Sequence, residues 1–307
     1  MADNKKSGGE HIFRLSHSSA NLMRGCEQRF FHHKGLTPKD SDYVEDMSSL
    51  ILGKVVHYVL EMGGHQRIKT KDVYKHIMFY CAEHKVKYSE LDVPLIVAMV
   101  LKYFKFIEKN FSDYELVVAE KEIKTPTFLG YIDAIFKNSK TGEWFICDLK
   151  TARLMAASRE KYKATLANDY QLNLYSYYAK DVGSHWNLDP EKFKGAWYRV
   201  VSKPRLKRRN EGRERPEEDT DYIKRLYKKI ECLNYFVPLD LLNPDEFKTN
   251  HDELHKRGFD ILNKKVEPKK NFKNCMDFFR PCPWWSKCHG DNYSNLKDNT
   301  QVKEVVL

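Results

Sequence analysis

Hydrophobic residues recur every three or four positions through the first third of the chain, and this spacing predicts helices. Ser16 and Ser18 are candidate N-caps for a helix over residues 18–33, and Gly35 marks its end. Three further segments have the same periodicity and are expected to be helical: 50–63, 71–85 and 93–110. The N-terminal part of the chain is therefore predicted to be helical.

The period changes from helical to strand-like after the last of these segments. Three apolar stretches are expected to be consecutive strands, and they begin at Tyr114, Phe128 and Trp144. A helix is expected next, over residues 168–181, and the apolar run at 195–201 suits a fourth, inner strand. This order of helices and strands predicts an α/β fold.

The last third of the chain combines a charged loop, two helices and an aromatic, cysteine-rich end. Pro204 and Pro216 punctuate the charged stretch, which is expected to be an exposed loop. Helices are predicted over residues 219–236 and 245–263. We expect four regions, the last packed on the first: 1–110, 111–202, 203–218 and 219–307.

Composition places the chain among globular proteins. Its 307 residues suffice for one large or two modest domains, and 41% of them are hydrophobic. The formal net charge of +10 favours an acidic partner such as DNA, although many proteins with lysine-rich surfaces bind no nucleic acid. No apolar segment predicts a membrane span or a secretory signal, so a cytoplasmic location is expected. The seven cysteines are spread along the chain, which favours metal binding or burial over disulfides.

Three charged residues interrupt the second and third predicted strands. Asp148 and Lys150 are two residues apart, so they share one face of a strand, and Asp133 of the preceding strand is expected beside them. Two neighbouring carboxylates repel each other unless a cation or a proton lies between them. The alternative is an ordinary salt bridge at a sheet edge. The apolar run before Asp148 favours an inner position, where an unpaired charge costs about 2–5 kcal/mol, and hence a functional role.

Four motifs follow one another along the chain: GKVVHYVLE with His57, GYID with Asp133, CDLK with Asp148 and Lys150, and QLNLY with Gln171 and Tyr175. In this order they resemble the motifs of the PD-(D/E)XK nucleases, within the RecB-type branch that includes AddB-like and CRISPR-adaptation-associated nucleases. The resemblance covers residues 50–180. It implies a restriction-endonuclease-like core, in which helices flank a central mixed sheet. A helical N-terminal part and a C-terminal cysteine-rich iron-sulfur segment would complete the fold.

The resemblance also implies a site for Mg²⁺ or Mn²⁺. Its ligands would be His57, Asp133, Asp148 and the backbone carbonyl of Leu149. Carboxylate and carbonyl oxygens suit both ions, and the imidazole favours Mn²⁺. A histidine buried in the core is the alternative for His57. Glu61 and Glu120 are further candidates for metal contacts, with a solvated face as the alternative for each.

Lys150 would orient or deprotonate the attacking water and counter the charge that grows on the phosphate. Its alternative role is that of a counter-ion to Asp148. Gln171 and Tyr175 are one helical turn apart and would hold the DNA backbone or Lys150. Ordinary helix packing is the alternative for Tyr175.

Four cysteines form the second candidate site: Cys26, Cys275, Cys282 and Cys288. The last three lack the C-x-x-C knuckle of an ordinary zinc ribbon. In the iron-sulfur group of the same branch, one N-terminal cysteine joins three near the C-terminus. The resemblance therefore implies a [4Fe-4S] cluster that clamps both ends of the chain and contributes about 5 kcal/mol. The interval between Cys275 and Cys282 is wider than the usual pattern, and Zn²⁺ with Cys275 or His289 as the fourth ligand is the alternative.

The charged loop supplies candidate contacts to DNA phosphates: Lys203, Arg205, Lys207, Arg208 and Arg209. A solvated loop is the alternative, because glutamates lie close by in the sequence. The resemblance implies a metal-dependent deoxyribonuclease, an exonuclease that acts on single strands or duplex ends in recombination, repair or phage DNA metabolism. Its expected setting is a bacterial or phage-infected cell, with a helicase or recombinase as a possible partner. A non-catalytic DNA-binding scaffold subunit with the same fold and cluster is the alternative.

Overall fold

A computed structural model describes residues 13–35, 48–64, 69–153, 160, 164–209, 217–277, 280–282, 284 and 288. The chain forms two compact units. Unit 1 comprises Met1–Glu45, Lys124–Leu129 and Thr249–Leu307, and unit 2 comprises Asp46–Ile123 and Gly130–Lys248. No helix in the described residues is long and apolar enough to cross a membrane. The four regions expected from the sequence stay a prediction.

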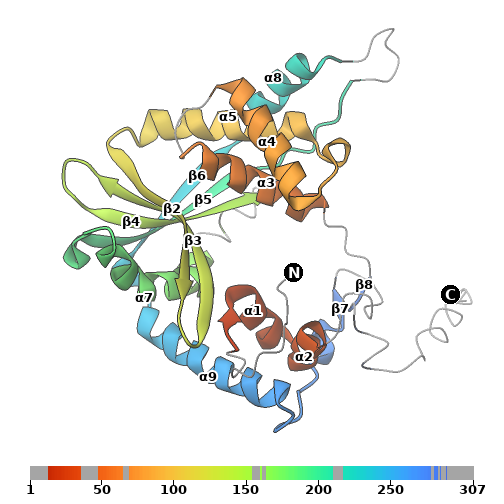
Figure 1. Cartoon of the computed structure of the whole chain (residues 1–307), viewed down its shortest axis with the longest axis vertical. Coiled ribbons are helices and arrows are strands. Elements are labelled where there is room, and N and C mark those ends of the chain that lie inside the picture. Colours follow the sequence, from red (N-terminus) through yellow and green to blue (C-terminus); the bar gives the residue numbers. More distant parts are fainter. Residues whose placement is uncertain are drawn as a thin grey trace, which may run out of the picture. The chain divides into compact units, whose positions relative to one another are not determined.

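A mixed sheet forms the centre of unit 2 (Figure 1). Its strands are β2 (Tyr114–Lys124), β3 (Phe128–Asn138), β4 (Trp144–Ala152), β5 (Phe193–Ser202) and β6 (Cys232–Pro238). β2 pairs with β3, and the order then runs β3-β4-β5-β6, with β4 and β5 parallel and the pairs at either side of them antiparallel. The predicted mixed sheet flanked by helices is confirmed.

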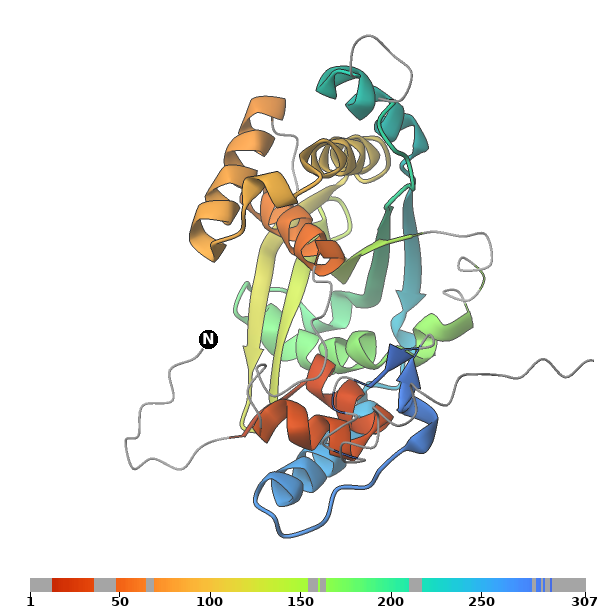
Figure 2. The same cartoon turned by 90° about the vertical axis from the view of Figure 1, so that its right-hand side faces the viewer.

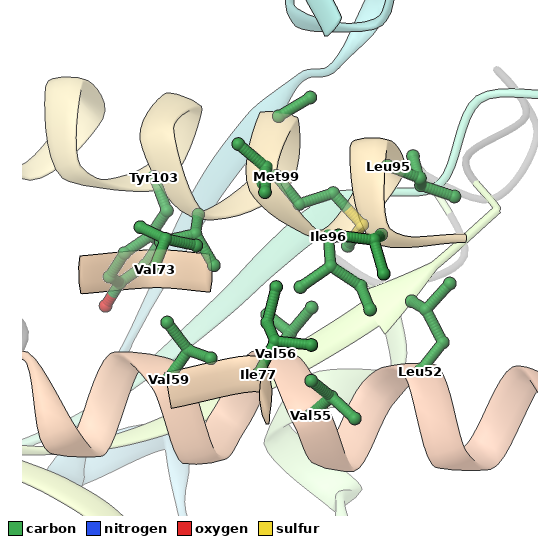
Figure 3. Close-up of a cluster of buried hydrophobic side chains, with 14 of the residues drawn as sticks. Leu52, Val55, Val56, Val59, Val73, Ile77, Leu95, Ile96, Met99 and Tyr103 are labelled. Atoms are coloured by element: carbon green, nitrogen blue, oxygen red, sulfur yellow. The ribbon is translucent and has the colours of Figure 1, made fainter. Parts of the chain in front are cut away.

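Three helices bury their apolar faces against one another and against this sheet (Figure 3). They are α3 (Ser48–Met62), α4 (Thr70–His84) and α5 (Val93–Asn110), as the periodicity predicted. Val56, Ile77 and Ile96 represent the three helices in this cluster, and each is fully buried. Complete burial of one such side chain contributes about 1.5–3 kcal/mol. The cluster therefore fixes α3, which carries His57, against β4.

The connection from β4 to β5 crosses over through α7 (Tyr170–Ser184), which packs on both strands. Two parallel neighbours require such a crossover. Asp169 caps the start of α7, because its side chain accepts a hydrogen bond from the N–H of Leu172 at 2.9 Å. This cap fixes where the first turn of α7 begins, and that turn carries Gln171.

The helix predicted over residues 219–236 is wrong in its second half. α8 spans Asp219–Lys229 and packs on α5, whereas residues 232–238 form β6 beside β5 (Figure 2). β5 is buried along almost its whole length, so without β6 its outer edge would leave buried backbone groups unpaired. Tertiary pairing therefore outweighs the local helical pattern there. The last predicted helix is confirmed as α9 (Pro244–Leu262).

The helix predicted over residues 18–33 is also wrong, because Cys26 interrupts it. α1 (His17–Gly25) and α2 (Glu27–Gly35) lie on either side of Cys26, whose backbone is extended with φ −165° and ψ 116°. The side-chain amides of Asn271 and Asn274 donate to the carbonyl of Gly25 at 2.9 and 2.6 Å. A partner from the far end of the chain thus takes the carbonyl that would continue the helix.

Unit 1 joins the two ends of the chain through pairing and charge. β1 (Leu15–Ser16) pairs in parallel with Phe128 and Leu129. Arg257 of α9 donates to both carboxylate oxygens of Glu27 at 3.0 and 2.7 Å. The N–H of Lys269 donates to the same carboxylate at 2.8 Å, and these bonds to a charged group are stronger than neutral ones. They hold the start of α2 against the segment that leads to β7 (Met276–Asp277) and β8 (Arg280–Pro281).

Gly195, near the start of β5, has a φ of 130° and lies close to the backbone of β6. A Cβ at this position would lie 2.3 Å from the carbonyl oxygen of Val237, which cannot rotate away. We expect Gly195→Ala to lower the free energy of unfolding by about 3 kcal/mol, measured by urea denaturation. Gly53→Ala is the control. Its Cβ would meet the Thr151 hydroxyl at 3.0 Å, which a side-chain rotation relieves, and helix propensity improves by about 1 kcal/mol. Equal losses in both variants would contradict this account.

Candidate functional site

The antiparallel ladder between β3 and β4 stops at the pair Ala134 and Cys147. The next positions are Asp133 and Asp148, and there the pairing is no longer backbone to backbone. Oδ2 of Asp133 accepts a hydrogen bond from the N–H of Leu149 at 2.6 Å. The carboxylate thus takes the place of a ladder bond and is fixed at the point where the strands part. The side chain of Leu149 packs in the core, and the ligand role of its carbonyl stays a prediction.

His57, Glu120 and Asp133 form a group in which one potential ligand atom of each lies within 4.8 Å of the others. Nδ1 of His57 lies 3.6 Å from Oδ1 of Asp133 and 3.9 Å from Oε1 of Glu120. Burial lowers the pKa of His57, but the Asp133 and Glu120 carboxylates outweigh it and raise this pKa above its ordinary value. One imidazole and two carboxylates that converge in a partly buried position fit a divalent cation.

Glu120 has a backbone conformation that is unusual for its residue type. Its φ is 47°, in the left-handed region, although it lies within β2. A non-glycine residue there costs about 1–2 kcal/mol, and such strain persists where the surrounding structure requires it. The sequence named Glu120 only as a further candidate, beside a solvated face. The backbone turn that directs it toward Asp133 carries no sequence signal that periodicity can detect.

Asp148 and Lys150 form a pair next to this group. Nζ of Lys150 lies 2.9 Å from Oδ1 and 2.8 Å from Oδ2 of Asp148. Asp148 is 1% exposed, and the Lys150 side chain is 35% exposed. Burial lowers the pKa of Lys150, but Asp148 first and Asp133 next outweigh it and raise this pKa. Lys150 is therefore an ammonium at neutral pH, one side of which stays open to solvent.

Gln171 of α7 also contacts Lys150, and Tyr175 of the same helix contacts Gln171. Nζ also donates to Oε1 of Gln171 at 2.9 Å. Nε2 of Gln171 donates to the hydroxyl oxygen of Tyr175 at 3.1 Å, and that oxygen accepts from the N–H of Tyr131 at 3.2 Å. Burial raises the pKa of Tyr175, so the phenol stays neutral. A continuous chain of hydrogen bonds thus joins β4, α7 and β3 and orients the ammonium.

The structure also shows where the predicted metal ligands lie. It brings His57 and Asp133 together and adds Glu120 to them. Both oxygens of Asp148 lie on Lys150 instead, and burial raises the pKa of Asp148 to about 7, an effect that the lysine opposes. Glu61 follows His57 by one turn of α3, and burial first and the charge of Glu120 next raise its pKa.

The four cysteines of the second predicted site line a single cavity in unit 1, together with Arg29, Lys270 and Asn274. The members are Cys26, Cys275, Cys282 and Cys288, and all four are free thiols. The N–H of Asn271 points at Sγ of Cys26 at 3.5 Å, and the N–H of Cys282 donates to the carbonyl of Cys275 at 2.8 Å. These contacts bring thiols from opposite ends of the chain to one place.

The neighbouring thiols influence one another in this cavity. Burial and then the adjacent thiol of Cys282 raise the pKa of Cys288 to about 11, an effect that Lys270 opposes. Among the described residues, no three of the four Sγ atoms lie within 4.8 Å of one another. His289, the other candidate ligand, lies outside the described residues. The remaining cysteines do not contribute to the cavity: Cys81, Cys147 and Cys232 pack among hydrophobic side chains.

The charged loop separates into two groups of side chains. Lys203, Arg205 and Lys207 line a cavity of about 530 Å³. Arg208 instead bonds to Asp219 and to the carbonyl of Glu217. Arg209 is tied through its N–H to the Glu217 carboxylate. Residues 210–216 of this loop lie outside the described residues.

A family model described as the PD-(D/E)XK nuclease superfamily matches residues 14–289, a range that contains both candidate sites. No curated protein matches the chain.

Proposed function

The chain belongs to the PD-(D/E)XK nuclease superfamily, and on this basis we propose that it is an exonuclease that hydrolyses single-stranded DNA or duplex ends. The family consists of nucleases that use divalent metals. The observation that supports the proposal best is that a set of metal ligands and a lysine ammonium lie next to each other at the point where β3 and β4 separate. His57, Glu120 and Asp133 offer a cation its ligands, and Lys150 offers a fixed positive charge beside it.

The proposed ligands of Mg²⁺ or Mn²⁺ are His57, Glu120 and Asp133, with Asp148 and the carbonyl of Leu149 as the further ligands expected from the sequence. When bound, a divalent cation supplies charge neutralisation at the scissile phosphate and a more acidic water for the attack. Asp133 contributes rigidity, because its second oxygen is already held by the N–H of Leu149. A ligand fixed before binding keeps the reacting groups in register.

Lys150 is proposed to stabilise the charge on the phosphate rather than to remove a proton. Its raised pKa favours the ammonium form at neutral pH. Asp148 and Gln171 occupy part of its donor capacity and fix its direction. A charge fixed in this way needs no reorganisation as the negative charge on the phosphate increases, which is how electrostatic catalysis lowers a barrier. Gln171 and Tyr175 act as positioning residues through Lys150.

The cysteine cavity is proposed to hold a [4Fe-4S] cluster, as in the iron-sulfur nucleases of the RecB-type branch. A tetrahedral zinc site with bonds of about 2.3 Å holds its sulfur atoms about 3.8 Å apart. No three of the described thiols lie within 4.8 Å of one another, so at least one sulfur separation in each set of three exceeds the spacing of a zinc site. A four-iron cluster binds each thiolate to a different iron atom and therefore needs wider spacing. The spacing supports iron over zinc.

The proposed setting is recombination, repair or phage DNA metabolism, with a helicase or recombinase as partner. The positive charge of the chain supports a polyanionic substrate. A scaffold subunit would have no need of an ammonium held by three acceptor atoms beside a set of metal ligands. The complete arrangement favours the enzyme.

The test uses purified protein and an oligonucleotide labelled at both ends, with Mn²⁺, Mg²⁺ or EDTA. We expect degradation from an end with either metal and none with EDTA. Asp133→Asn keeps the shape of the side chain but removes its charge, and it is expected to be inactive. Equal degradation by the wild type and this variant would indicate a contaminant. If the protein binds the oligonucleotide but degrades it under none of these conditions, the alternative of a non-catalytic DNA-binding scaffold would be favoured over the nuclease.

A further inference from the structure

A basic cavity lies at the carboxyl ends of β4 and β5. The parallel register of these strands ends at the pair Ala152 and Ser202, so Arg153 and Lys203 leave the sheet side by side. The N–H of Lys203 donates to the carbonyl of Ala152 at 2.7 Å and keeps the two exits together. From there the segment up to Lys207 forms one wall of the cavity of about 530 Å³.

Basic side chains are concentrated in the lining of this cavity. Four of its lining residues are basic: Arg153, Lys203, Arg205 and Lys207. In the part of the chain that the structure describes, no carboxylate lies within 4.0 Å of the side chains of Arg153, Arg205 and Lys207. Burial first and the charge of Arg153 next lower the pKa of Lys203, which indicates that the positive charges crowd one another. Such crowding favours a bound anion.

Two acids, Glu90 and Asp92, also line the cavity, and both already have partners. Asp92 accepts from the N–H of Leu95 at 3.2 Å as the N-cap of α5, and Glu90 pairs with Lys87 at 3.2 Å. The apolar side chains of Leu52, Leu91 and Leu95 complete the lining. A cavity with cations on one side and apolar groups on the other suits a phosphodiester chain with its sugars and bases.

We propose that this cavity binds the phosphodiester backbone of the substrate strand a few nucleotides away from the scissile bond, an inference that rests on the proposed nuclease function. Arg153 follows Lys150 by three residues of extended chain, which is about 10 Å. Successive phosphates of one strand are at least about 3.4 Å apart, which is the helical rise, so the cavity lies within about three nucleotides of the active site. Arg208 has no part in it, because Asp219 and the Glu217 carbonyl hold its guanidinium.

The experiment compares two triple variants that remove the same charge. The cavity variant is Arg153→Gln, Arg205→Gln, Lys207→Gln. The control variant is Lys137→Gln, Lys140→Gln, Lys194→Gln, which lie near the opposite ends of the strands, and whose ion pairs are solvent-exposed and contribute little. Binding of a fluorescent thymidine oligonucleotide is measured over a series of salt concentrations in EDTA. Hydrolysis of bis(4-nitrophenyl) phosphate, which is too short to reach the cavity, is measured with Mn²⁺.

We expect the cavity variant to bind the oligonucleotide at least about tenfold more weakly, with a salt slope reduced by about 2, which corresponds to three lost single-strand phosphate contacts. Its hydrolysis of the short ester should equal that of the wild type. The inference is overturned if the cavity variant keeps the wild-type affinity and slope, or if the control variant loses as much. Failure of the wild type to hydrolyse the ester and the oligonucleotide would overturn the nuclease function instead, and the EDTA measurement would still test the cavity.

Discussion

Lys150→Gln is expected to lower the rate of DNA cleavage about a thousandfold while Mn²⁺ still binds. Removal of one preorganised group that stabilises transition-state charge typically costs a factor of about 10²–10³. The glutamine side chain can still donate a hydrogen bond to the buried Asp148 carboxylate, so this variant avoids the large loss of stability caused by a buried charge without a partner. The ligand group of His57, Glu120 and Asp133 does not include Lys150, which is why metal binding should survive.

The measurement pairs single-turnover cleavage with calorimetric titration of Mn²⁺. Asp133→Asn is the comparison, because it should lose both cleavage and most of the metal affinity. Lys137→Gln, an exposed lysine of β3, should change neither quantity. The assignment of charge stabilisation to Lys150 fails if Lys150→Gln cleaves at the wild-type rate. It also fails if this variant loses Mn²⁺ as completely as Asp133→Asn, because the lysine would then serve the metal site.

Strand and helix periodicity predict which side chains of one element share a face. Alternation along β4 places Asp148 and Lys150 on one face, and they are hydrogen-bonded there. A spacing of four along α7 places Gln171 and Tyr175 together, and their side chains are 3.1 Å apart. These relations are local, because they depend only on the geometry of a single element. Which elements meet was implied by the resemblance to the nuclease family and not by periodicity.

Relations that depend on distant partners could not be predicted in this way. Glu120 reaches Asp133 only because its backbone takes a left-handed turn, which glutamate does not favour. β6 forms because β5 needs a partner on its outer edge. The break at Cys26 arises from asparagines about 245 residues further along the chain. In each case long-range contacts outweigh local propensity.

That break in the N-terminal helix has a consequence for the cysteine cavity. Had residues 18–33 stayed one helix, the backbone of Cys26 would have helical dihedral angles. Instead its backbone is extended, and Sγ lies among the three C-terminal cysteines. Cys26 is therefore the single thiol that ties the beginning of the described chain to its end at the proposed cluster.

Cys26→Ala is accordingly expected to abolish the proposed cluster and to destabilise unit 1. A link between residues so far apart in sequence contributes about 4–5 kcal/mol in the chain-entropy description, and loss of a bound metal removes its binding free energy as well. We expect loss of the visible absorbance and of the bound iron, and a lower midpoint of thermal unfolding. His57, Glu120 and Asp133 belong to unit 2, so their affinity for Mn²⁺ should persist in this variant.

Cys81→Ala is the matched control. Cys81 is a buried thiol of α4 that packs among hydrophobic side chains, so its replacement should cost about 1 kcal/mol and leave the iron content unchanged. Iron and zinc are quantified in both variants and in the wild type purified without oxygen. If Cys26→Ala keeps the visible absorbance and the iron content of the wild type, Cys26 is not a ligand of the cluster. Stoichiometric zinc without iron in the wild type would show that the site binds zinc and not an iron-sulfur cluster. The thiols would then have to move closer together on binding, because zinc requires sulfur atoms about 3.8 Å apart.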